Sequence, residues 1–116
     1  EDVKYFVGFD TTGKAIIDKN KFAEIEIQKR VNEINTEFDR QCNKVGVYFE
    51  GNKFQYDDTS RSRLAETKDD ARVTFWRSVD NKNIPLTNVK KNSLYKVLID
   101  TYYTEFAKKS QVIDGL

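Results

Sequence analysis

Apolar residues recur at alternating steps of four and three through residues 27–45, and no other feature of the sequence constrains the fold as strongly. The stripe consists of Ile27, Val31, Ile34, Phe38, Gln41 or Cys42, and Val45. One face of an α-helix has this period, which is close to the seven-residue repeat of coiled coils. We therefore expect a helix over about residues 20–44. Gly46 should end it, because glycine tolerates the backbone conformation that follows a helix.

A helix with one apolar face has to bury that face. The stripe either packs against the rest of its own domain or pairs with the same stripe of another copy, and three heptads leave both arrangements open. A second helix is predicted over about residues 88–111, where apolar residues recur every four positions. These residues are Leu94, Leu98, Tyr102 and Phe106. Before this helix, Pro85 disfavours helical backbone at its predecessor and Thr87 is a suitable N-cap.

The segment between the two helices is dense in turn and cap signals. Residues 47–56 contain two short β-prone runs around Gly51-Asn52, which predicts a compact hairpin. Several candidate N-caps at residues 57–60 precede a weakly apolar stretch, residues 61–72, for which we expect a short helix on the surface. Residues 73–79, around the single tryptophan, alternate as a strand should, and a turn is expected at residues 80–83.

The first 18 residues form a separate unit in this interpretation. Two β-prone runs flank the turn sequence Asp10-Thr11-Thr12-Gly13, which predicts a hairpin or an extended arm over residues 1–18. Residues 19–116 then form the main domain. Because the sequence contains no methionine, we expect it to be a piece of a longer protein. The predicted fold class is α+β: two long helices packed together, a short hairpin, an extra strand around Trp76, and the N-terminal unit.

The charge pattern argues against nucleic-acid binding. Twenty basic and nineteen acidic residues give a net charge of +1, and the two signs are interleaved along the chain. A nucleic-acid surface would instead gather basic residues on one face. The short basic pairs Lys90-Lys91 and Lys108-Lys109 are interpreted as solvated helix faces. No run of about 18 apolar residues occurs, so no membrane span is expected.

Catalytic and metal-binding signals are weak. The chain has no histidine and a single cysteine, so it lacks the usual zinc ligands, an intrachain disulfide and a Cys–His nucleophile pair. Cys42 falls on the apolar stripe, where a thiol behaves as a small hydrophobic group. Asp57 and Asp58 are adjacent before a predicted helix, which is typical of caps rather than of an acid/base pair across a cleft. We expect no catalytic residues, metal or cofactor.

The order of elements and motifs resembles a known family, domain of unknown function 4376, found in bacteriophage tail proteins. The similar stretches are V-Y-F-E-G-N-K-F-Q-Y, D-x-x-S-R, V-T-F-W-R-S-V-D-N and I-P-L-T, within about residues 20–116. Val79 departs from the family's usual small residue. The matching positions are Phe49, Gly51, Phe54, Ser60, Arg61, Trp76, Arg77, Asp80, Asn81, Pro85 and Thr87.

These motif residues have structural interpretations. Ser60 is expected to cap the short helix and Thr87 the last one, while Phe54 and Trp76 pack the strands onto the long helices. Arg77 and Asp80 are expected to pair at the strand end. The resemblance carries over no catalytic residue.

The resemblance implies a non-catalytic structural or interaction module of a phage tail, associated with a fibre or the baseplate. A tail-fibre assembly chaperone is the alternative, and a small hydrolase is a distant third. The implied location is the virion tail, after synthesis in the bacterial cytoplasm. Implied partners are other tail proteins and further copies of this chain, with a trimer favoured for a fibre. The expected interface residues are Ile27, Val31, Ile34, Phe38, Tyr102 and Tyr103.

Overall fold

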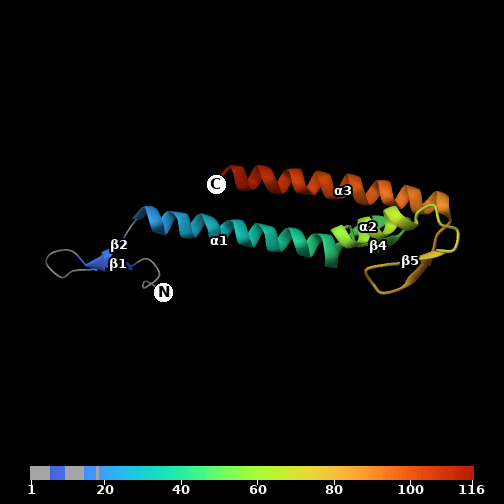
Figure 1. Ribbon diagram of the computed structural model, residues 1–116, viewed down its shortest axis with the longest axis horizontal. Coiled ribbons are helices and arrows are strands. Elements are labelled where there is room, and N and C mark those ends of the chain that lie inside the picture. The colour runs from blue at the N-terminus through green and yellow to red at the C-terminus, as the bar shows by residue number, and fades with distance from the viewer. Residues whose placement is uncertain (1–5, 10–14, 18) are drawn as a thin grey trace.

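The computed structural model describes residues 6–9, 15–17 and 19–116. Two long antiparallel helices, α1 (Lys19–Arg40) and α3 (Asn88–Asp114), lie side by side (Figure 1). The shorter elements between them gather at one end of the pair. We call this end the head, residues 41–101, and we call residues 19–40 and 102–114 the helical arm. The mixture of long helices and small antiparallel sheets confirms the α+β prediction.

The strands of the described residues form three two-stranded antiparallel sheets. In the head, β3 (Val47–Phe49) pairs with β4 (Asn52–Phe54), and β5 (Phe75–Arg77) pairs with β6 (Asn83–Pro85). The third sheet pairs β1 (Phe6–Phe9) with β2 (Ala15–Ile17). The turn expected at residues 10–13 lies outside the described residues.

The first helix ends in a widened turn. A π-helical turn, η2 (Gln41–Val45), follows α1, and the Gly46 N–H closes it on the Gln41 carbonyl at 2.8 Å. Gly46 has φ +72°, so the predicted glycine stop is confirmed. A Cβ atom there would lie 2.6 Å from the Phe54 carbonyl oxygen and 2.8 Å from Val79 Cγ2. Glycine is therefore required both for the backbone conformation and for the close approach of β4.

The short helix begins earlier than predicted. α2 (Asp58–Thr67) starts three residues before the expected position, and its N-cap is Asp57, which accepts from the Ser60 backbone N–H at 3.2 Å. The expectation that Ser60 is the cap is therefore wrong. The chain enters this helix at a fixed point, because the Tyr56 N–H donates to the Cys42 carbonyl at 3.0 Å. Thr87 caps α3 as predicted, accepting from the Lys90 N–H at 3.2 Å.

A small apolar core holds the head together. Its buried members are Cys42, Phe54, Tyr56, Leu64, Leu86, Leu94 and Leu98. They come from η2, from β4 and the loop after it, from α2, from the approach to α3, and from α3 itself. Trp76 and Ile84 of the β5–β6 sheet are partly buried and pack against this core. Full burial of a side chain of this size contributes about 1.5–3 kcal/mol. Cys42 is 2% exposed, which confirms its interpretation as a core residue.

Candidate interaction surfaces

The apolar stripe of α3 changes from buried to exposed along its length. Leu94 and Leu98 are fully buried in the head, whereas Phe106 is 40% exposed and Val112 is 51% exposed in the arm. The sequence repeats the same apolar pattern along α3, so the change in burial depends on which elements pack against each half of the helix. The core elements cover the first half of α3, and only α1 lies beside the second half (Figure 1).

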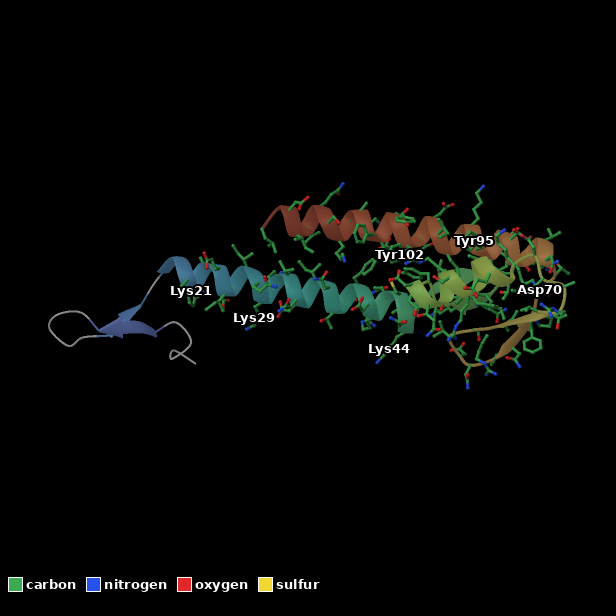
Figure 2. All side chains as sticks on the ribbon, viewed as in Figure 1. Lys21, Lys29, Lys44, Asp70, Tyr95 and Tyr102 are labelled. Carbon is green, nitrogen blue, oxygen red and sulfur yellow. The ribbon has the colours of Figure 1, made fainter. Side chains whose placement is uncertain are left out.

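The stripe of α1, which continues into η2, changes in the same direction. Cys42 is buried, Phe38 packs against the core, and Ile27 is 44% exposed farther out on the arm. Phe38 is the main contact between the helices: its ring meets Tyr102 edge-on at 5.4 Å and Phe106 at 6.2 Å. Figure 2 shows Tyr102 on the side of α3 that faces α1. The apolar seam of the arm is thus closed near the head and open beyond it.

Two cavities lie along the open part of this seam. One, of about 360 Å³, extends between the helices and is lined by residues such as Ile34, Phe38 and Val112. The other, of about 540 Å³, also involves Ile34 and Val112, together with Arg30, Glu33 and Glu37 of α1. Apolar side chains that line a groove without filling it leave contact energy unused. The structure therefore brings together Ile34, Phe38 and Tyr102 of the predicted interface, with Val31 half-buried on the same stripe. Tyr103 is 58% exposed and stands against Tyr102.

The charged residues of the arm form ion pairs within each helix. The pairs at i, i+3 spacing are Arg30–Glu33, Arg40–Glu37 and Lys108–Glu105, at 3.5, 2.7 and 3.1 Å. Hydrogen bonds from Arg40 and Gln41 lower the pKa of Glu37 to about 2. Exposed pairs of this kind stabilise a helix by a few tenths of a kcal/mol. Both helices therefore carry positive and negative side chains beside the seam.

Arg61 connects α2 to the helix pair. Its guanidinium carbon lies 3.5 Å from the centre of the Tyr102 ring, and its Nε donates to the Tyr56 carbonyl at 3.1 Å. It also pairs with Asp58 one turn earlier on α2. Only 11% of the Arg61 side chain is exposed. A planar cation stacked on an aromatic ring contributes about 0.5–2 kcal/mol, depending on its desolvation. The role of Arg61 is thus structural, at the boundary of head and arm.

The other motif residues shape the hairpins. Gly51 has φ +85° with open space around it, so only the turn conformation requires glycine there. Phe54 is fully buried, and Phe49 meets its ring edge-on at 6.3 Å. Pro85 is part of β6 and lies opposite Phe75 in the register. This strand was not predicted, since the segment was expected only to lead into α3.

The turn between β5 and β6 corrects a predicted ion pair. Arg77 Nη1 donates to the Asn81 carbonyl oxygen at 3.0 Å and to Asn81 Oδ1 at 2.8 Å. No ion pair within 4 Å joins Arg77 and Asp80, so the expected pair between them is wrong. Asn81 adopts φ +64°, a left-handed conformation that asparagine tolerates better than most residues. This conformation turns its carbonyl toward Arg77.

A cavity of about 490 Å³ lies beside this turn, within the size range of ligand sites. It is bounded by the end of β4, by α2 and by the β5–β6 hairpin. Its lining residues are Gln55, Ser60, Arg63, Val73, Phe75, Trp76, Arg77, Ser78, Val79, Asn81 and Asn83. Two arginines and two aromatic rings therefore share one hollow with no lining carboxylate.

Lys91 is the main structural residue that sequence reasoning missed. It was interpreted with Lys90 as part of a solvated face, but its side chain has no exposure. The Lys91 ammonium donates to the carbonyls of Thr67, Asp70 and Val73 at 3.0, 2.7 and 2.6 Å. These acceptors lie 18 to 24 residues earlier, so no local spacing reveals them. Lys90, in contrast, is half exposed and pairs with Glu50 at 2.8 Å.

The shifted pKa values of the head have structural causes. Burial raises the pKa of Cys42 to about 11 and that of Tyr56 to about 12. Hydrogen bonds from Arg72 lower the pKa of Asp70 to about 2. Figure 2 places Asp70 in the loop near the start of α3, far from the arm. Within residues 6–9, 15–17 and 19–116, no three His, Cys, Asp or Glu side chains gather closely enough to hold a metal ion.

None of the helices in the described part of the chain is both long and apolar enough to cross a membrane. Comparison with known proteins gives no match: no family model, no curated protein and no solved structure is significantly similar to the chain. The resemblance to the phage-tail family thus remains a prediction, supported by the quoted motif residues.

Proposed function

We propose that this chain is a structural interaction module of a bacteriophage tail, and that it assembles through its helical arm without catalysis. One observation supports the assembly role above the others: the apolar seam between α1 and α3 continues into the arm after the core has ended. Ile27, Phe106 and Val112 are between 40% and 51% exposed there. A contiguous exposed apolar patch typically marks an interaction site.

The partner that this surface fits best is another copy of the same chain. The seam has near-heptad spacing on α1, and positive and negative side chains flank it on both helices. Packing copies together around one axis would bury the open seams against one another, as in a helical bundle. We propose a trimer, the symmetry that suits attachment to a fibre. The assignment to a tail rests on the resemblance of the motifs.

The assembly role is tested by sedimentation equilibrium of the purified chain over a wide concentration range. A trimer would give three times the 13.6 kDa mass of one chain. A monomer at the highest concentration would contradict self-association. A dimer would support the interface and contradict the trimer.

The tail assignment is tested on purified particles of the phage that encodes the chain. Quantitative mass spectrometry should find the protein in a fixed ratio to the other tail proteins. An assembly chaperone would copurify with fibre protein from the infected cell and be absent from mature particles. Absence from both samples would contradict both roles.

A further inference from the structure

The six arginines of the chain divide into two groups by their partners. Arg30, Arg40, Arg61 and Arg72 each lie within 4 Å of a carboxylate. Among the residues that the structure describes, Arg63 and Arg77 have no carboxylate within 4 Å, although acidic residues are about as numerous as basic ones in the chain. Both of these arginines line the same cavity beside the β5–β6 hairpin. The two arginines without a carboxylate partner therefore border one hollow.

The two arginines present free hydrogen-bond donors to this cavity. Arg77 uses only Nη1 to hold the turn at Asn81, so Nε and Nη2 have no partner among the described residues. These two nitrogens form the edge of a guanidinium that binds a carboxylate through two parallel bonds. The Arg63 guanidinium, on the exposed side of α2, makes no hydrogen bond, ion pair or ring contact within the same part of the chain.

Aromatic and amide groups complete the lining. Trp76 is half-buried and Phe75 is 51% exposed, while Gln55, Asn81 and Asn83 supply neutral donors and acceptors. No carboxylate belongs to the lining. Asp80, in the adjoining turn, is exposed and forms no ion pair within 4 Å with any residue that the structure describes. Tryptophan and arginine are the residues most enriched where proteins bind one another tightly.

The location favours an extended peptide as the ligand. The β5–β6 sheet has two strands, so each strand leaves one edge without a strand partner in the described structure. An extended segment can pair with such an edge while its side chains enter a neighbouring pocket. We call the cavity beside the β5–β6 hairpin the Trp76 cavity. We infer that it binds an acidic peptide segment of a partner protein, whose carboxylate is held by Arg63 and Arg77. This site is separate from the helical seam and does not depend on self-association.

The single tryptophan of the chain reports on this site directly. The intact chain is titrated with a capped peptide in which two glutamates alternate with alanines, and Trp76 fluorescence is recorded. A glutamine version of the peptide and sodium phosphate serve as comparison ligands. We expect a saturable change with the glutamate peptide that weakens as salt is added. The glutamine peptide should give no saturable change.

Arg63→Gln and Arg77→Gln should each weaken binding about tenfold, because each removes charge-assisted hydrogen bonds. Arg77→Gln also releases the turn at Asn81, so Arg63→Gln is the decisive variant. Lys44→Gln, which removes an exposed positive charge outside this cavity, is the control and should bind as the unmodified chain does. The inference would be overturned by equal responses to both peptides, by no saturable response up to about 10 mM peptide, or by unchanged binding in Arg63→Gln. Phosphate binding as tightly as the glutamate peptide would also overturn it, in favour of a small inorganic anion.

Discussion

The Lys91 ammonium nitrogen lies 2.6 Å from the Val73 carbonyl oxygen, at a position with no solvent exposure. The same ammonium also donates to the carbonyls of Thr67 and Asp70. A single side chain of α3 therefore fixes the loop that links α2 to β5 through hydrogen bonds. Val73 is part of the lining of the Trp76 cavity. The placement of this cavity relative to the helix pair therefore depends on Lys91.

Lys91→Met should destabilise the fold by about 2–3 kcal/mol, because the Val73 carbonyl would lose its one hydrogen-bond donor among the described residues and two further carbonyls would each lose a donor. Lys90→Met is the matched control. Its ion pair with Glu50 is half exposed, and its loss should cost less than about 1 kcal/mol. Urea unfolding, monitored by Trp76 fluorescence, measures the free energy of unfolding of both variants. Equal stabilities of the two variants would contradict the structural role of Lys91.

Gly46→Ala should be more damaging than Gly51→Ala. Both glycines have positive φ, so each substitution forces alanine into the left-handed region at a cost of about 1–2 kcal/mol. At Gly46 the new methyl group would also overlap the Phe54 carbonyl and Val79, whereas a methyl group at Gly51 would meet no other described residue within 4 Å, its chain neighbours aside. We expect a difference of at least about 1 kcal/mol in unfolding free energy between the variants. A larger loss for Gly51→Ala would show that β4 does not approach Gly46 as described.

Val112→Asp should abolish self-association. Val112 borders both cavities of the arm, and a carboxylate there would be desolvated when copies pack together. Val89→Asp is the matched control, since Val89 is 76% exposed at the opposite end of the same helix. The two variants are compared by sedimentation equilibrium with the unmodified chain. If both variants dissociate, or neither does, the interface does not lie on the arm.

Stability should decrease at alkaline pH. Burial raises the pKa of Tyr56 to about 12 and that of Cys42 to about 11 in the folded chain, above their values in an unfolded chain, about 10 and 8.5. The contribution that neutral Tyr56 and Cys42 make to the free energy of unfolding is fully present below about pH 8.5. It is lost as the pH rises through 11 to 12. Tyr56→Phe should match the unmodified chain at pH 7 and lose less stability at pH 11. Urea unfolding at pH 7 and pH 11 measures the stability of both chains. If both lose the same stability between these pH values, Tyr56 is not a cause of the loss.

The long helices were predictable because their signals are local. Side chains three and four residues apart share one face whatever the rest of the chain does, so the stripes of α1 and α3 are visible in the sequence. Gly46 and Thr87 mark helix ends through conformations and hydrogen bonds within one turn of each residue. The same rules indicated the hairpin at Gly51.

The wrong predictions concern features that depend on contacts between residues far apart in the sequence. Four consecutive residues were able to cap α2, and the bond from the Tyr56 N–H to Cys42 fixes the register in which Asp57 does so. The left-handed conformation of Asn81 directs its carbonyl to Arg77 and leaves Asp80 outside that contact. No sequence pattern could place Lys91 among carbonyls of another element.

The candidate surfaces were predictable to different extents. The stripe residues Ile34 and Phe38 were expected at an interface, and they do lie along the open seam. The Trp76 cavity was not expected, because its lining comes from the end of β4, from α2 and from the β5–β6 hairpin. What identifies it is that Arg63 and Arg77 form no ion pair within the described part of the chain, and only the folded structure shows which arginines are paired.

The gradual opening of the seam gives each long helix two halves with different local stability. Leu94 and Leu98 anchor α3 within the head, so its amides there become accessible to solvent only when the core opens. Beyond Phe106 the backbone is held by few tertiary contacts and can fray without disturbing the head. In the isolated chain, amide hydrogen exchange should therefore divide one unbroken helix into a slow half and a fast half. A partner that covers the seam should therefore slow amide hydrogen exchange in the fast half of the helix.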